Sequence, residues 1–185
     1  RVKYVELLIP YRREVKVSWL NDLLISEPRL RFIKVYGSKE DEFLDKDINK
    51  LNAKILFFKK DIRKNSREII SQSRFCKNMD VFLESQNYNI GLNRKVSVSS
   101  DGSIKNYIDH DFVFGNVKKD KIKNIVFKDN FKSKWLISND KIEKCKECQY
   151  RYSCVSNSDI EQKGKLFHKK ETCDFNPETN KWMIN

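Results

Sequence analysis

Four cysteines near the carboxyl end constrain this chain more than any other feature. They form the run Cys145-x2-Cys148-x5-Cys154-x18-Cys173 in a chain of 185 residues. A Cys-x2-Cys pair places two sulfurs on one tight turn, and the two later cysteines raise the number of thiolate donors to four. Such a set binds a tetrahedral zinc ion or an iron–sulfur cluster. We predict one inorganic centre here, and the spacing alone does not choose between zinc and iron–sulfur.

Other uses of these cysteines fit the sequence less well. Two disulfides would suit a secreted protein, but Glu6 and Pro10 interrupt any signal-peptide core, and Cys76 makes the cysteine count odd. A redox-active Cys-x-x-Cys follows a strand, whereas Cys145 follows a lysine-rich, helix-like stretch. We interpret Cys76 as a buried apolar thiol. We therefore expect a reducing compartment and a cytoplasmic protein.

Composition bears on membrane and nucleic-acid binding. No apolar run approaches the ~20 residues that a membrane span needs, so we expect no membrane partner. The chain has 38 Lys+Arg and 26 Asp+Glu, a formal net charge of +12, which a zinc-based nucleic-acid binder would also have. The lysines alternate with acids and Asn, and no predicted helix has a one-sided basic stripe. We interpret the charge as a solvated surface and do not expect nucleic acid as a partner.

Three strand-like segments, at 4–9, 30–36 and 54–59, lie in the first sixty residues. The first is a near-continuous apolar run, which is typical of a buried parallel strand. A complete barrel needs ~200 residues or more. The pattern therefore predicts βαβαβ units with right-handed crossovers, at the end of a larger α/β domain.

Two helices are expected between these strands. The first has Val17, Leu20 and Leu24 at helical spacing. For the second, Ser38-x-x-Asp41 resembles a capping box at a helix start. Its apolar face would consist of Phe43, Leu44, Ile48 and Leu51.

The pattern changes after residue 60, and we place the domain boundary in the polar stretch 60–74. An Asp101-Gly102 turn between alternating residues predicts a β-hairpin over 95–107. Residues 120–137 have helix-like spacing, and the chain ends in a loop-rich tail. His110 and His168 have no neighbours in the sequence that indicate catalysis, and we assign neither a catalytic role.

Several motifs in this second part occur in a characteristic order. They are Leu92-Asn93-Arg94-Lys95, Asp101-Gly102, Phe114-Gly115-Asn116-Val117, Cys145-x2-Cys148-x-Tyr150-Arg151-Tyr152-x-Cys154 and Cys173-Asp174-Phe175-Asn176-Pro177. Together they resemble the SPASM domain of radical SAM peptide maturases, most closely that of grasp-with-spasm systems. The resemblance covers residues 75–185, while residues 1–62 look like the last βα units of a partial radical SAM-type barrel. The expected fold class is therefore α/β plus α+β.

The resemblance implies the metal ligands. The family pattern has two auxiliary [4Fe–4S] clusters, one of them held by cysteines equivalent to Cys145, Cys148, Cys154 and Cys173. The other would need cysteines at about positions 91, 107 and 158, where this chain has Gly91, Tyr107 and Ser158. We expect one cluster, with the second absent. Around it we expect Tyr150, Arg151 and Tyr152, whose contacts would tune its potential.

The resemblance also implies a function. It suggests a component of a bacterial peptide maturase that modifies a ribosomally made precursor peptide together with an ATP-grasp ligase. Cleavage of S-adenosylmethionine needs a Cys-x3-Cys-x2-Cys triplet, which does not occur in the sequence. We expect that the triplet lies before Arg1 or has been lost, and we assign no catalytic residue. The alternative is a noncatalytic four-cysteine zinc module for protein interaction or nucleic-acid binding.

Overall fold

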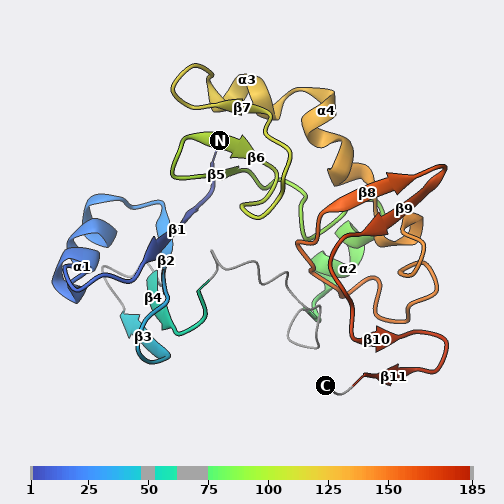
Figure 1. The fold of residues 1–185 in the computed structure, drawn as a ribbon, viewed down its shortest axis with the longest axis horizontal. Helices are drawn as coiled ribbons and strands as arrows, with labels where there is room; N and C mark the ends of the chain where they lie inside the picture. Colours follow the sequence, from blue (N-terminus) through green and yellow to red (C-terminus); the bar gives the residue numbers. More distant parts are fainter. Residues whose placement is uncertain (1, 47–52, 62–74, 184–185) are drawn as a thin grey trace. The chain divides into compact units, whose positions relative to one another are not determined.

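The computed structural model describes residues 2–46, 53–61 and 75–183. The chain divides into two compact units, Arg1–Ser66 and Arg67–Asn185, called the N-terminal and C-terminal units below (Figure 1). Among the described residues, no helix has the length and apolar character needed to cross a membrane.

The N-terminal unit is a four-stranded sheet with one helix. Its elements are β1 (Val5–Pro10), α1 (Val17–Ser26), β2 (Leu30–Tyr36), β3 (Glu42–Lys46) and β4 (Ala53–Phe58). The strand order is β1-β2-β4-β3, with β1, β2 and β4 parallel and β3 antiparallel to β4. The bounds of the three predicted strands are confirmed to within one residue. The helix that begins at Val17 and the parallel pairing of β1 with β2 are also confirmed.

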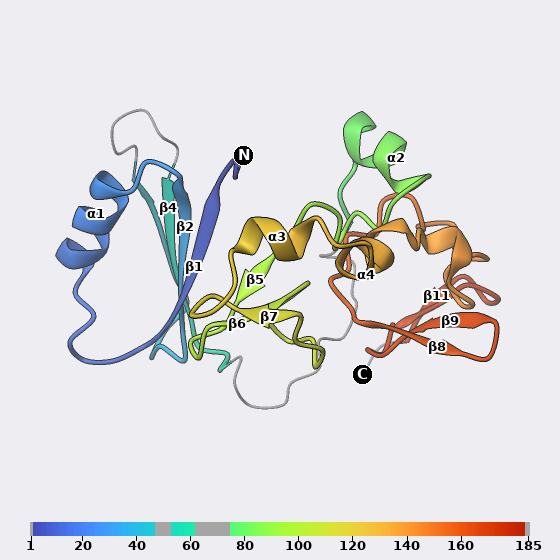
Figure 2. The same ribbon diagram turned by 90° about the horizontal axis from the view of Figure 1, so that it is seen from above.

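Helix α1 covers one face of this sheet (Figure 2). Leu20 and Leu24 of α1 are buried against alternating residues of β2 and β4, among them Ile33 and Ile55. Alternation of this kind is expected where one face of a sheet is covered. The first strand is parallel as predicted, but the prediction that it is buried is wrong, because β1 pairs only with β2 among the described strands and Val5 is 43% exposed.

The predicted second helix is also wrong, because its first half forms β3. The Ser38 hydroxyl donates to Glu40 O at 2.5 Å, and Asp41 accepts the backbone N–H of Lys59 at 2.7 Å, so neither caps a helix. Pairing with β4 replaces the helical hydrogen bonds, and Phe43 is left half-exposed. Ile48 and Leu51 lie outside the described residues.

The C-terminal unit consists of short elements. They are α2 (Met79–Ser85), β5 (Ser97–Val98), β6 (Ser103–Lys105), β7 (Gly115–Asn116), α3 (Ile122–Val126), α4 (Asp129–Lys132), the 3-10 helices η2 (Ser133–Leu136) and η3 (Asn139–Lys141), and the strands β8 (Ile160–Lys163), β9 (Leu166–Lys169), β10 (Phe175–Asn176) and β11 (Lys181–Trp182). Strands β5, β6 and β7 form one antiparallel sheet, while β8–β9 and β10–β11 are separate hairpins.

The predicted hairpin around Asp101-Gly102 is confirmed as β5 and β6. Gly102 has φ +91° and its N–H donates to Ser99 O at 2.9 Å. Of the two turn residues Asp101 and Gly102, only Gly102 has a positive φ. The connection is therefore a turn followed by one left-handed glycine, which is the usual three-residue hairpin.

The helix expected over 120–137 is divided into α3, α4 and η2. Lys128 has extended backbone angles (φ −68°, ψ 141°) and separates the first two. The bend lets Ile125 and Phe131 pack together on Ile104 of β6. Trp135 contacts this cluster and also the neighbouring one around Ile142, so that it joins the two parts of the core.

Gly91 marks a close approach between two loops of the C-terminal unit. A Cβ at this position would lie 1.7 Å from the backbone oxygen of Ser156. The neighbouring Leu92 is fully buried in the core. The loop that holds Gly91 therefore cannot move away from Ser156 without withdrawing Leu92 from the core.

We predict that Gly91→Ala lowers the free energy of unfolding of the C-terminal unit by about 3 kcal/mol or more, because backbone must shift on both sides. The control is Gly164→Ala, where φ is +63° but no heavy atom lies within 4 Å of the new Cβ. It should cost only about 1 kcal/mol from the left-handed backbone. Urea unfolding followed by circular dichroism measures both. Equal losses for the two variants would contradict the close approach.

Candidate metal centre

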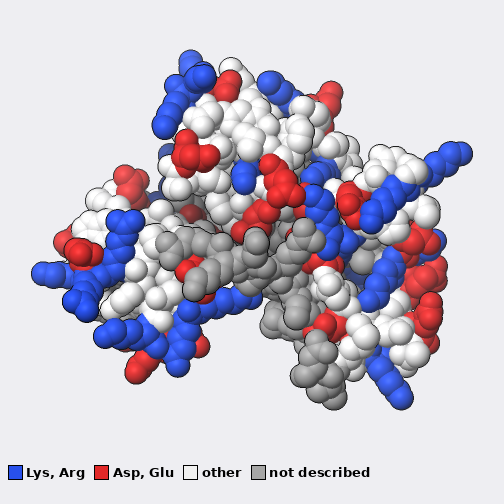
Figure 3. All heavy atoms as spheres, in the orientation of Figure 1, with Lys and Arg blue, Asp and Glu red and all other residues white. Residues whose placement is uncertain are grey.

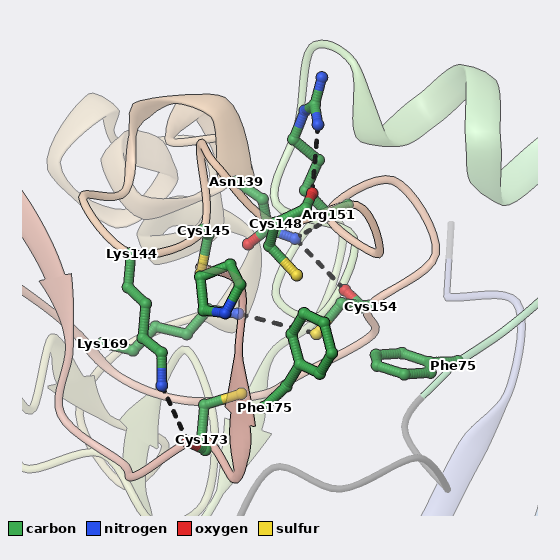
Figure 4. A pocket seen from close by; sticks show the side chains of 11 residues that line it. Phe75, Asn139, Lys144, Cys145, Cys148, Arg151, Cys154, Lys169, Cys173 and Phe175 are labelled. Atoms are coloured by element: carbon green, nitrogen blue, oxygen red, sulfur yellow. Dashed lines mark hydrogen bonds between the residues drawn. The ribbon is translucent and has the colours of Figure 1, made fainter. Parts of the chain in front are cut away.

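All four cysteines of the run line one pocket of the C-terminal unit. They come from three segments: the turn that holds Cys145 and Cys148, the residue Cys154 that follows it, and the connection from β9 to β10 that holds Cys173. Figure 4 shows the four thiols around a common space. The tertiary structure thus brings Cys173 to the other three.

Successive tight turns shape the first part of the site. Cys145 N donates to Ile142 O at 2.9 Å, Cys148 N to Cys145 O at 3.0 Å, and Cys154 N to Tyr150 O at 3.0 Å. Burial raises the pKa of the Cys148 thiol, and the backbone N–H of Tyr150, which is directed at this thiol, offsets part of that rise. A backbone donor of this kind stabilises a thiolate, which is the form that binds metals.

Aromatic residues hold the ends of the unit against this turn. Phe75 forms a β-bridge with Cys154 and stacks on Tyr150, with ring centroids 4.7 Å apart. Phe175 of β10 contacts Tyr150 at 4.9 Å and Trp182 of β11 at 5.1 Å. Phe75 and Phe175 also line the pocket, so it is largely apolar on this side.

Lys169 brings a positive charge into the pocket. Its ammonium donates a hydrogen bond to Cys154 Sγ at 3.8 Å (Figure 4). Burial lowers the pKa of this ammonium, but the thiols of Cys145, Cys154 and Cys173 outweigh burial and leave the pKa above its ordinary value. This residue was missed in the sequence, where it is one lysine among many. Its position two residues after the apolar Phe167 on a strand is the only local indication.

The thiols themselves are in an environment that opposes ionisation. Burial raises the pKa of Cys145, and the neighbouring thiols raise it further, while Lys169 lowers it. Burial likewise raises the pKa of Cys148. A bound cation would reverse this, because metal binding displaces the thiol protons. The donor set therefore fits a metal or a cluster better than it fits free thiolates.

Arg151 is part of the site, while the two flanking tyrosines lie outside its lining. The Arg151 guanidinium donates to the Asp140 carboxylate at 2.8 Å and to the backbone oxygen of Cys148 at 3.1 Å. It contacts the Cys-x2-Cys turn through a carbonyl, and no hydrogen bond from it to a sulfur is observed among the described residues. Tyr150 belongs to the aromatic cluster, and Tyr152 packs on Phe82 and Arg151.

Cys76 does not line the pocket. It follows Phe75, is half-buried, and its sulfur accepts a hydrogen bond from the Asn78 amide at 3.3 Å. The interpretation as a buried apolar thiol is therefore wrong, because the residue is only half-buried and a polar side chain contacts its sulfur. The geometry does keep Cys76 apart from the four-cysteine set.

The sulfurs are spread around the pocket. Among the described residues, no three side chains of Cys, His, Asp or Glu are arranged closely enough to ligate one metal ion. Four thiolates on a single zinc ion lie roughly 3.8 Å apart, given Zn–S bonds of about 2.3 Å. In a [4Fe–4S] cluster each cysteine binds a different iron, so its sulfurs lie farther apart.

Gly91, Tyr107 and Ser158, where a second cluster would need cysteines, have other contacts. Gly91 has no room for a side chain. Tyr107 packs beside His110, with ring centroids 6.0 Å apart. Ser158 is 5% exposed and donates a hydrogen bond to the Glu171 carboxylate. Polar residues occupy this part of the unit.

His110 is at the centre of this group. It is 2% exposed, with Nε2 2.9 Å from Asn157 O and Nδ1 3.5 Å from Asp159 Oδ1. Lys134 pairs with the same Asp159 carboxylate oxygen. Burial raises the pKa of Asp159, but Lys134 and His110 outweigh burial and leave the pKa below its ordinary value. The carboxylate is therefore ionised and paired at neutral pH.

No protein-family model, curated protein or solved structure matches this chain.

We predict that the C-terminal unit loses stability as the pH falls from 7 to 5. Burial lowers the pKa of His110 below its ordinary 6.5, although Asn157 O, Asp159 and Glu171 favour the charged form and Lys134 opposes it. Below about pH 6.5 the unfolded state binds more protons at His110 than the folded state does. The free energy of unfolding therefore decreases as the pH falls. The pKa of Asp159 lies below its ordinary value of 3.8, so protonation of this carboxylate changes the stability only at a pH below the range from 7 to 5.

Urea unfolding at pH 7, 6 and 5 measures the slope for the unsubstituted protein and for His110→Gln. The variant should show a smaller slope between pH 7 and 5. Unfolding at pH 7 verifies that the variant folds. Identical slopes for the two proteins would contradict the assignment to His110.

Proposed function

We propose that the C-terminal unit is a SPASM-type domain that binds one [4Fe–4S] cluster through Cys145, Cys148, Cys154 and Cys173. The whole chain would combine the end of a partial radical SAM-type barrel with this domain. It would act in the bacterial cytoplasm, in the maturation of a ribosomally made peptide together with an ATP-grasp ligase.

One observation carries the proposal: four thiols from three separate segments line a single pocket. Free thiols gathered in this way would be exposed to mutual oxidation, whereas a shared centre gives each of them a ligand role. Asn139 lines the same pocket and supports the cysteine loop, because its Nδ2 donates to Arg151 O at 2.7 Å. The order of the motifs along the sequence supports the family.

The motif order favours a cluster over a single ion, because the family it resembles holds an auxiliary [4Fe–4S] cluster through the equivalent four cysteines. Four cysteine thiolates are the usual ligand set of such a cluster. The apolar lining by Phe75, Phe175 and Pro177 would keep water from such a cluster.

The chain's own role in maturation would be noncatalytic. Its sequence has no Cys-x3-Cys-x2-Cys triplet, so S-adenosylmethionine would bind only if another part of the protein supplied that cluster. The residues described here would hold the auxiliary cluster for electron transfer or form the scaffold that presents the precursor peptide. Arg151 and Asp140 would stabilise the ligand turn from outside.

The alternative is a noncatalytic zinc module, whose four-thiolate ligand set is the same. A nucleic-acid-binding version of it would need a basic surface. On the face drawn in Figure 3, Lys and Arg side chains are interspersed with Asp and Glu. This favours a protein or peptide partner over nucleic acid, and it is consistent with the ion pairs of Lys146 with Glu143 and Lys163 with Glu161.

Metal content distinguishes cluster from zinc. After anaerobic purification and reconstitution, we predict about four iron and four sulfide per chain, with the broad visible absorbance of a [4Fe–4S] cluster. One zinc per chain without visible absorbance would contradict the cluster and favour the alternative.

A ligand substitution tests the assignment of the site. Cys148→Ser should reduce bound iron to below about one per chain and unfold the C-terminal unit, because binding of the centre supplies folding energy to its loops. The matched control is Cys76→Ser, which should retain the iron and change stability by less than about 0.5 kcal/mol. Iron analysis and thermal melting measure both. A Cys148→Ser protein with full iron content would show that the ligand set is wrong.

A further inference from the structure

Strand alternation directs Lys169 toward the cysteines. Lys169 and Phe167 are two residues apart on β9 and therefore face the same side. Phe167 packs in the core with Ile142, and its carbonyl accepts the N–H of Glu143 at 2.8 Å. These contacts hold β9 beside the chain that leads into Cys145.

The next residue faces the opposite way. Lys170 pairs with Asp111 at 3.0 Å and lies 3.5 Å from Asp159. Each of these cations therefore meets a different set of negative groups. Lys170 meets carboxylates, and Lys169 meets sulfur.

Lys169 has no carboxylate within ion-pair distance among the residues that the structure describes. Its ammonium donates to Cys154 Sγ at 3.8 Å, and the other groups that attract its charge are the thiols of Cys145 and Cys173. An ammonium withdrawn from water without a counter-charge is costly. Thiolates in the pocket would supply that counter-charge.

We propose that Lys169 is a positioning residue of the four-cysteine centre. Its ammonium is a fixed positive charge that offsets the negative charge of the sulfur donors, and it thereby sets the affinity and the reduction potential of the group that they bind. This inference rests on the proposed function, since it assumes that the cysteines act as ligands.

The expected effect follows from charge. Four thiolates bring more negative charge than Zn²⁺ or a [4Fe–4S]²⁺ core cancels, so a nearby cation stabilises the complex. Reduction adds one more negative charge, which the same cation also stabilises. Hydrogen bonds to sulfur and nearby positive charge both raise the potential of such clusters. Loss of the ammonium should therefore make the cluster harder to reduce.

Three variants test this in the full chain. Lys169→Met removes the charge and keeps most of the aliphatic stem, while Lys169→Arg keeps the charge. The control is Lys144→Met, because Lys144 lines the same pocket but its ammonium donates to the backbone oxygen of Cys173 at 2.9 Å (Figure 4). Circular dichroism verifies the fold of each variant.

The first measurement is the midpoint potential of the reconstituted cluster, followed by electron paramagnetic resonance. Lys169→Met should shift the midpoint potential to a more negative value. Lys169→Arg keeps the charge, so its potential should stay close to that of the unsubstituted protein. Lys144→Met should change the potential less than Lys169→Met does. The second measurement is Zn²⁺ affinity by chelator competition, where Lys169→Met should bind about 10- to 100-fold more weakly.

The outcomes separate the two proposals. A cluster whose potential is the same in Lys169→Met and in the unsubstituted protein would overturn the role of Lys169 and leave the proposed function standing. Binding of zinc alone would overturn the cluster, and Zn²⁺ affinity would then decide on Lys169, an unchanged affinity overturning its role. An unsubstituted protein that takes up neither cluster nor zinc would overturn both.

Discussion

The C-terminal unit depends on contacts that join its loops at the cysteine pocket. Isolated two-stranded hairpins such as β8–β9 and β10–β11 are marginal in water by themselves. Two isolated bridges connect distant segments, Phe75 with Cys154 and Ile142 with Phe167. Both bridges involve a cysteine of the set or the residues leading to one. A centre bound by all four cysteines would strengthen the same connections, which is why we regard binding and folding of this unit as one process.

Neighbouring side chains of β9 face opposite sides of the strand, so Lys169 and Lys170 contact different groups. On one side of the strand, Lys169 faces thiols in a pocket lined by Phe75 and Phe175. On the other side, Lys170 joins Lys134 at the buried carboxylate of Asp159. In the first arrangement, Lys169 would be a cation beside the negatively charged centre that we propose. The second is satisfied within the protein and has a structural explanation without any ligand.

The second arrangement lies close to Gly91, Tyr107 and Ser158. Gly91 leaves no space for a side chain against Ser156, and Ser158 is hydrogen-bonded to Glu171. His110 lies between Asn157 and Asp159 beside Tyr107. Hydrogen bonds and ion pairs thus connect these loops without any ligand.

The sequence alone predicted the four-cysteine run, the three parallel strands and the Asp101-Gly102 hairpin, because short-range patterns specify turns and strands and mark candidate thiol donors. It misassigned 38–51, since Asp41 pairs with the distant Lys59 N–H in place of capping a helix. Tertiary structure alone decided that Cys173 reaches the pocket, that Lys169 joins it, and that His110 is buried with Asp159. These are contacts between segments far apart in sequence, and a lysine or histidine acquires its chemistry from the dielectric and charges that those contacts create around it.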